Sequence, residues 1–239
     1  KIKNIAIISL SSGTIGEAFA KHELDIGVKR LRGFGLNVTF MPHALKGIEY
    51  VRNHPAERSA DLLQALRDPE IDMILCAIGG DDTYRLLPHL FEHGKLREVV
   101  SEKVFLGFSD TTINHFMLHN VGMKTFYGQS FLADICELDE MMLPYTEGYF
   151  RELISTGTIR EIRPSDIWYE ARTLYGVDQI GTPLKSHPDH GFELLQGNPV
   201  FSGTILGGCI DSIYDIFHGD RYAEMPLLCR KYALFPKTE

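Results

Sequence analysis

The sequence predicts an α/β protein, with an N-terminal parallel-sheet domain over residues 1–155 and then a linker and the beginning of a smaller, β-rich domain over residues 156–239. Two observations support this division. In the first part, apolar runs alternate with amphipathic stretches of helical periodicity, as strands and helices do in a parallel sheet. From about Tyr145 the periodicity weakens, and Gly and Pro become frequent. The pattern of the first part predicts a sheet of the Rossmann or flavodoxin-like type.

Each predicted strand is a short apolar run without polar alternation, which is typical of strands buried on both faces. The runs cover residues 5–10, 36–41, 71–78, 104–108 and 124–127. Helices are predicted between them over residues 22–35, 56–67 and 86–96, and from residue 111 onward. Because ligands bind beyond the carboxyl ends of parallel strands, we expect a site in the loops after the first, third and fourth strands. These loops read SSG, GGDD and SD.

Composition and charge exclude several classes of protein. Hydrophobic residues make up 44% of the chain and charged residues 23%, which is typical of globular proteins. The 32 acidic and 24 basic residues give a net charge of −8, and Lys and Arg do not cluster, so no nucleic-acid partner is expected. No apolar stretch is long enough to span a membrane, so no membrane partner is expected. The first apolar run is predicted to be a strand and not a signal peptide.

The sequence shows no motif for metal binding or for redox chemistry. The four cysteines form no C-x-x-C pair, and reduced thiols are the expectation for a cytoplasmic protein. His115 and His119 are spaced for one helix face, and His187 and His190 share a loop, but neither pair has a third ligand at a usual spacing. We therefore expect no metal site.

The sharpest local signal is VFLGFSDTT over residues 104–112, where a strand leads through Gly107 and Ser109 into a helix. A tight turn between strand and helix is the architecture that exposes a nucleophilic serine above a sheet. The N–H of Asp110 is expected at the helix N-terminus, where it can stabilise an oxyanion. The same residues also suit a plain helix N-cap, so the local pattern alone leaves both interpretations open.

A second signal is CAIGGDDTYRLL over residues 76–87. Glycines directly after a strand let the backbone approach a ligand closely, so Gly79 and Gly80 are candidates to supply a second oxyanion donor or to cradle a phosphate at the next helix. Gly79, Asp81 and Asp82 are the predicted substrate-binding residues. A plain tight turn with an Asp cap is the structural alternative. The segment is also similar to the GGDGT loop of NAD kinases and diacylglycerol kinases, with Asp82 in place of its second functional glycine. A nucleotide-binding, kinase-like protein is therefore the alternative function.

Taken together, SSG, GGDD and GFSD resemble the LD-carboxypeptidases, the S66 family of serine peptidases. Within that family the chain is similar to the branch of microcin C self-immunity proteins, and the similarity extends to HPAERSADLLQAL, KTFYGQSF and SGTILGGCIDSIYDIFHGD. The resemblance implies a Ser–Glu–His triad without metal or organic cofactor. It assigns Ser109 as the nucleophile and the N–H groups of Gly80 and Asp110 as oxyanion donors. Glu239 is the candidate acid, because it is the only acidic residue in the closing segment LFPKTE.

The resemblance also implies a triad histidine beyond the acidic residue, and residues 1–239 contain no segment that matches it. Two alternatives stay open: either the sequence continues past Glu239, or the protein lacks the base. In the second case we expect negligible hydrolysis, because a serine without a base is a poor nucleophile, and the protein would bind peptide fragments without cutting them. Neither His190 nor His218 is expected to replace the base.

The activity that the resemblance implies is that of a cytoplasmic, homodimeric serine peptidase or amidase. It implies two classes of substrate. One is the L,D-peptide bond whose cleavage releases terminal D-Ala from muropeptides during cell-wall recycling. The other is the amide that joins a peptide or amino acid to a nucleotide, as in microcin C-type antibiotics. The GGDDT and YGQ segments are closer to the immunity branch, which favours the second class.

Overall fold

The computed structural model describes residues 1–235 and confirms the predicted parallel sheet. All its strands run parallel, in the spatial order β2-β1-β3-β4-β5, which is the flavodoxin-like order. The strands are shorter than the apolar runs that predicted them, because the ends of these runs turn away from the sheet into loops. They are β1 (Asn4–Ile8), β2 (Asn37–Phe40), β3 (Met73–Cys76), β4 (Val104–Gly107) and β5 (Phe126–Tyr127).

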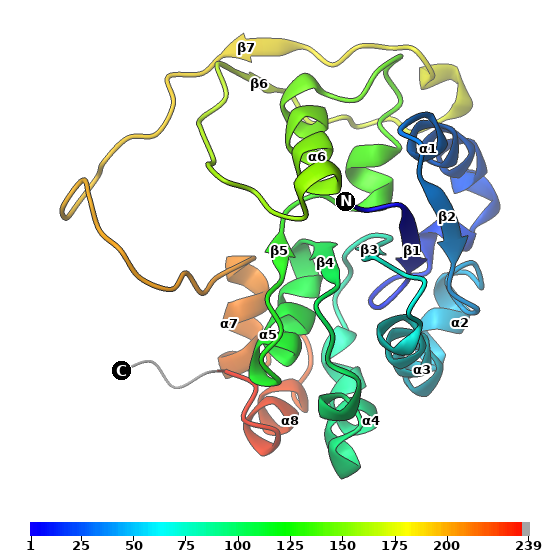
Figure 1. Cartoon of the computed structure of the whole chain (residues 1–239), viewed down its shortest axis with the longest axis vertical. Helices are drawn as coiled ribbons and strands as arrows, with labels where there is room; N and C mark the ends of the chain where they lie inside the picture. The colour runs from blue at the N-terminus through cyan, green and yellow to red at the C-terminus, as the bar shows by residue number, and fades with distance from the viewer. Residues whose placement is uncertain (236–239) are drawn as a thin grey trace.

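Helices cover both faces of the sheet, which makes three layers (Figure 1). Across the sheet, the chain first steps from β1 outward to β2. It then crosses back over β1 to β3 and continues in that opposite direction through β4 to β5. Since crossovers between parallel strands are right-handed, this reversal places the first helix on one face and the later ones on the opposite face. One layer holds α1 (Lys21–Gly33) and α6 (Pro144–Thr156). The other holds α3 (Pro55–Arg67), α4 (Leu87–Phe91) and α5 (Thr112–Asn120), and α2 (Ile48–Asn53) precedes α3.

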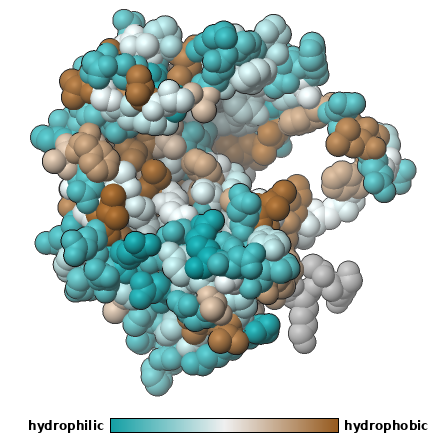
Figure 2. All heavy atoms as spheres, turned by 180° about the vertical axis from the view of Figure 1, so that it is seen from behind, coloured by the Kyte–Doolittle hydropathy of each residue, from teal (hydrophilic) through white to brown (hydrophobic). Residues whose placement is uncertain are grey.

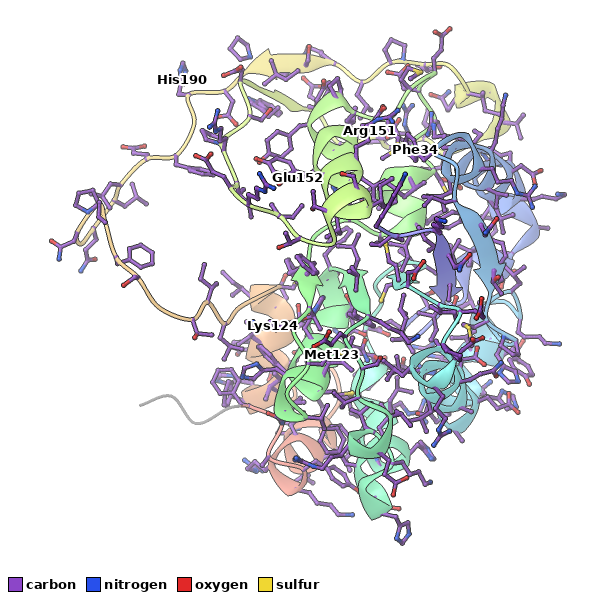
Figure 3. The ribbon with its side chains drawn as sticks, in the orientation of Figure 1. Phe34, Met123, Lys124, Arg151, Glu152 and His190 are labelled. Carbon is purple, nitrogen blue, oxygen red and sulfur yellow. The ribbon has the colours of Figure 1, made fainter. Side chains whose placement is uncertain are left out.

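The core lies on both sides of the sheet. Ile7 of β1, Leu75 of β3 and Phe105 of β4 are fully buried, and each such side chain stabilises the fold by about 1.5–3 kcal/mol. In the α1–α6 layer, the rings of Phe34 and Phe150 lie 5.8 Å apart. The guanidinium of Arg151 covers the Phe34 ring at 4.3 Å, and the two side chains face each other in Figure 3. These contacts pack α6 against the C-terminal end of α1.

One predicted helix is interrupted. The expected helix over residues 86–96 is split into α4 and two short 3₁₀ turns, Glu92–Gly94 and Arg97–Val99. The prediction was wrong here because His93 and Gly94 both have left-handed backbone angles, with φ of 60° and 69°. Two consecutive residues in this conformation reverse the chain, which a continuous α-helix cannot do.

The region after residue 156 contains a small antiparallel sheet and two helices. The sheet pairs β6 (Ile167–Tyr169) with β7 (Ser186–Pro188). The helices, α7 (Ile210–His218) and α8 (Met225–Lys231), were not predicted, and they pack beside α5 and α4. Tyr84 donates a hydrogen bond of 2.5 Å to Glu224, and Asn120 donates to the carbonyl oxygens of Ala233 and Leu234 at 2.8 and 3.0 Å. The domain boundary at residues 155/156 stays a prediction.

The segment between β7 and α7 stands away from the body of the protein (Figures 1 and 2). Several of its apolar side chains are largely exposed, among them Phe192, Leu195, Phe201 and Ile205. Among the helices of residues 1–235, none is long and apolar enough to cross a membrane.

Candidate active site

Three loops converge at the carboxyl edge of the sheet, as the sequence predicted. They follow β1, β3 and β4 and contribute Ser11, the segment 79–82, and the pair Ser109 and Asp110. β1 and β3 are neighbours, and the helices that follow them lie on opposite faces. In open α/β sheets this reversal opens a crevice beyond the strand ends, which is where ligands bind.

Ser109 occupies a sharp turn between β4 and α5. Its φ of 63° is left-handed, although the residue is not glycine, and its side chain is only partly buried. For a residue with a Cβ this conformation costs about 1–2 kcal/mol. A strained serine between a parallel strand and a helix is the geometry of a nucleophile elbow, in which the hydroxyl projects above the sheet.

Gly79 lies directly against Ser109. A Cβ atom on Gly79 would come within 2.8 Å of Ser109 Cβ and 3.0 Å of its Oγ. Gly80 instead faces Ser11, since its Cβ would approach Ser11 Oγ to 2.3 Å. Within residues 1–235, the N–H groups of Gly80 and Asp110 meet no protein acceptor. For Asp110 this is expected, because the N–H groups in the first turn of a helix have no partner within the helix. Their role as oxyanion donors stays a prediction.

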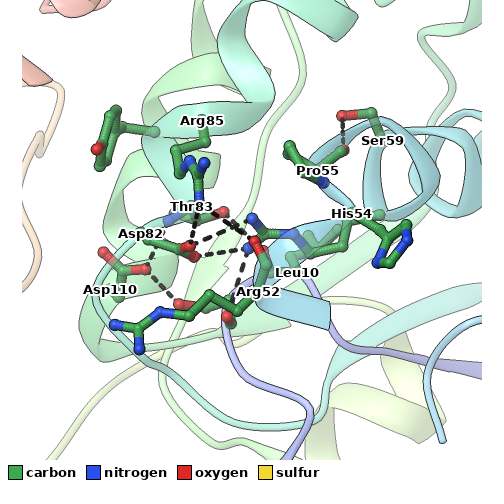
Figure 4. Close-up of polar contacts among 12 residues, drawn as sticks. Leu10, Arg52, His54, Pro55, Ser59, Asp82, Thr83, Arg85 and Asp110 are labelled. Carbon is green, nitrogen blue, oxygen red and sulfur yellow. Dashed lines mark hydrogen bonds and ion pairs between the residues drawn. The ribbon is translucent and has the colours of Figure 1, made fainter. Parts of the chain in front are cut away.

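The carboxylate of Asp110 ties the three loops together. It is buried, and it accepts hydrogen bonds from Ser11 Oγ and, at 3.1 Å, from the N–H of Thr83 (Figure 4). Burial away from water raises the pKa of Asp110 to about 6, and these hydrogen bonds oppose the rise. The side chain of the residue that follows the candidate nucleophile therefore fixes the relative positions of the loops, while its N–H meets no acceptor among residues 1–235.

Asp82 is held in a buried ion pair. Its carboxylate lies 2.7 Å from Arg58 Nη1, and both side chains are almost fully inaccessible. Arg58 also donates to the carbonyl oxygen of Leu10 at 3.0 Å, which connects α3 to the loop after β1. Asp82 thus stabilises the loop structure, and its side chain, paired with Arg58, occupies the position where a phosphate-binding loop needs a glycine. This argues against the kinase-like alternative.

Asp81 and Gly80 line a cavity of about 440 Å³ together with Ser12, Arg52 and Arg221. The cavity borders the loop that contacts Ser109, but Ser109 and Asp110 are not among the residues that line it. Another cavity, of about 500 Å³, lies along α6 and includes none of the predicted site residues.

No histidine within residues 1–235 hydrogen-bonds to Ser109. His115 is buried, and its Nε2 lies 2.9 Å from the carbonyl oxygen of Gly107 while its Nδ1 lies 2.7 Å from Thr125 Oγ1. A carbonyl can only accept, so Nε2 donates and Nδ1 accepts from the threonine hydroxyl. Burial lowers the pKa of His115 to about 4, so the ring is neutral and both nitrogens are engaged. His115 is therefore a structural residue.

The remaining candidates for base and acid are not assembled in the described part of the chain. His190 is exposed in the segment that follows β7 (Figure 3). His218 Nδ1 lies 3.1 Å from the carbonyl oxygen of Tyr214 in its own helix. Glu239 lies outside the described residues. Within residues 1–235, no group of three or more His, Cys, Asp or Glu side chains could hold a metal ion.

Sequence reasoning placed Ser11 in the predicted site loop SSG without assigning it a role, and it missed Arg58 and Thr83. A signal existed for Arg58, because it falls at helical spacing with Leu62 and Ala65 on the apolar face of its helix, where a charged residue requires a buried partner. For Ser11 the signal was its position after the first strand, and for Thr83 no signal distinguishes it from ordinary loop residues.

The sequence model described as the LD-carboxypeptidase N-terminal domain, of peptidase family S66, matches residues 5–128. The chain belongs to this family. A solved MccF-like protein from Streptococcus pneumoniae, in complex with AMP, is 60% identical, with a TM-score of 0.98 over 99% of this chain and 69% of that one. The family resemblance inferred from the sequence is thereby confirmed, including its microcin-immunity branch.

Two relatives from Bacillus subtilis carry carboxypeptidase names. The putative carboxypeptidase YocD is 27% identical over 100% of this chain and 67% of its own length. The probable murein peptide carboxypeptidase is 35% identical over 55% of this chain and 40% of its own length. The chain thus spans between 40% and 69% of the length of these three relatives.

Proposed function

We propose that this protein is a serine peptidase or amidase that cleaves an amide between a peptide or amino acid and a nucleotide, with Ser109 as the nucleophile. The observation that carries the proposal is the left-handed Ser109, with φ of 63°, packed against Gly79 at the carboxyl edge of a sheet in an S66 chain. The nucleotide part of the proposal draws on the MccF-like relative, which is described in complex with AMP.

In the proposed reaction, Ser109 Oγ attacks the carbonyl carbon of the amide and its proton passes to a base. The resulting oxyanion accepts hydrogen bonds from the N–H groups of Asp110 and Gly80. Collapse of the intermediate expels the amine, which takes up a proton, and water then hydrolyses the acyl-enzyme. Residues 1–235 provide the nucleophile and the donors, and no base contacts Ser109 among them. The family pattern assigns the remaining members to a glutamate, for which Glu239 is the candidate, and to a histidine.

Muropeptides are the second candidate substrate. The name of the murein peptide carboxypeptidase, which is 35% identical over 55% of this chain, favours it. In that reaction the same serine would cleave an L,D-peptide bond and release terminal D-Ala. The family resemblance further implies a homodimer that acts in the cytoplasm, and light scattering of the purified protein tests the dimer.

The experiment is to treat the full chain with a fluorophosphonate probe and to incubate it separately with a peptidyl-AMP amide and a muropeptide ending in D-Ala. We expect Ser109 to be labelled and Ser109→Ala to abolish both labelling and turnover. Mass spectrometry of the products identifies the substrate class. Absence of labelling, with turnover unchanged in Ser109→Ala, contradicts the proposal. Calorimetric binding without any product indicates a member that holds substrate without cutting it.

A further inference from the structure

Tyr127 lies beside the candidate nucleophile, although it comes from the next strand. The register of the sheet pairs Gly107 of β4 with Tyr127 of β5, and the N–H of Gly128 donates to the carbonyl oxygen of Gly107 at 3.1 Å. This pairing brings the Tyr127 hydroxyl to 3.1 Å from the backbone nitrogen of Ser109, from which it accepts a hydrogen bond. About half of the tyrosine surface remains exposed, at 46%.

The ring of Tyr127 has a rigid support. His115 packs against it with ring centroids 5.5 Å apart, and against Phe105 on another side at 5.2 Å in an edge-on arrangement. The imidazole itself cannot rotate freely, because its two nitrogens are bonded to Gly107 and Thr125. The position of the tyrosine hydroxyl is therefore set by the strand register and by a buried, hydrogen-bonded side chain.

Both backbone polar groups of Ser109, its N–H and its carbonyl oxygen, are hydrogen-bonded. Its N–H donates to Tyr127, and its carbonyl oxygen accepts from Thr112 Oγ1 at 2.7 Å. A strained left-handed residue persists only where its surroundings over-determine the conformation. The contact with Tyr127 also engages the N–H of Ser109, whereas the N–H of Asp110 meets no acceptor among residues 1–235.

We propose that Tyr127 is a positioning residue: its hydroxyl holds the peptide N–H of Ser109 and so presents the serine Oγ to the substrate. This inference rests on the proposed function in taking Ser109 as the nucleophile. The hydrogen bond itself does not depend on that function, so the two can be tested separately.

The test compares Tyr127→Phe with Tyr175→Phe in the full chain. Tyr175 is a suitable control, because it is also exposed and its hydroxyl makes one hydrogen bond, to the carbonyl oxygen of Arg172 at 2.9 Å. In Tyr127→Phe we expect the amide hydrogen of Ser109 to exchange with solvent about fivefold faster, as follows from losing one ordinary hydrogen bond. We also expect the maximal rate of fluorophosphonate labelling, at saturating probe, to fall about tenfold.

A purely structural role for Tyr127 would change the melting temperature and leave the labelling rate of the folded protein intact. Unchanged exchange of the Ser109 amide in Tyr127→Phe overturns the inference, and so does faster exchange with unchanged labelling. If the wild-type protein is not labelled, the proposed function fails. In that case, exchange of the Ser109 amide hydrogen alone tests whether Tyr127 fixes the backbone of Ser109. Tyr175→Phe should leave both readouts at wild-type values.

Discussion

Gly79→Ala tests the central contact of the candidate site. The added Cβ would lie 2.8 Å from Ser109 Cβ, whereas ordinary contacts begin at 3.4 Å, so the two residues must separate by about 0.6 Å. A displacement of about 1 Å at a reacting group reduces the rate by about a hundredfold, so we expect labelling of Ser109 to slow by about ten- to a hundredfold. Gly79 does not have a left-handed φ, so alanine introduces crowding without backbone strain.

The protein should remain folded in this variant. Overpacking of one methyl group costs about 1–3 kcal/mol, which lowers the melting temperature of a chain of this size by a few degrees. Gly128→Ala is the matched control, because a Cβ there would be 3.8 Å from Leu106 Cδ1 and the residue has no left-handed φ. If the same probe labels Gly79→Ala as fast as Gly128→Ala, the placement of the nucleophile against this loop is refuted.

Three further predictions concern the strain and charge around the site. Ser109→Gly should melt at or above the temperature of Ser109→Ala in calorimetry, because glycine removes a backbone strain of about 1–2 kcal/mol, and a lower temperature contradicts the strain. The pKa of Asp110 is raised from about 3.8 in the unfolded state to about 6 in the folded state, so the folded state binds a proton more tightly. This proton binding contributes to the free energy of unfolding at low pH, and the contribution is lost as the pH rises from about 4 to about 6. Asp110→Asn should therefore lose less stability than wild type between these pH values in urea titrations, and parallel curves would contradict the assignment. Asp82→Ala leaves the buried Arg58 guanidinium without its carboxylate and should lower the free energy of unfolding, measured by urea titration, by about 3–5 kcal/mol. A loss of less than about 1 kcal/mol would indicate a solvated pair and contradict its burial.

The fold could be predicted because local signals agree with it. Apolar runs without alternation mark strands buried on both faces, and Gly35 marks the end of the first helix, which closes with a φ of 78° at that glycine. The interruption of the helix after Leu86 was missed although two local signals existed: Gly94 is a helix-ending residue inside the predicted range, and histidine is among the non-glycine residues that adopt a left-handed backbone more often. Helices α7 and α8 were missed because the preceding segment is rich in Gly and Pro and masks their periodicity.

By itself, the sequence determined which loops form the candidate site and which serine stands at the strand-to-helix turn, because residues that follow parallel strands must meet at one edge of the sheet. Only the tertiary structure decided the roles around that serine. Tyr127 reaches it through the strand register, Ser11 and Thr83 meet on the carboxylate of Asp110, and Arg58 neutralises Asp82 from a helix. These partners are separated by 18 to 99 residues along the chain. Their pairing depends on the packing of strands and helices, which no local pattern of residues specifies.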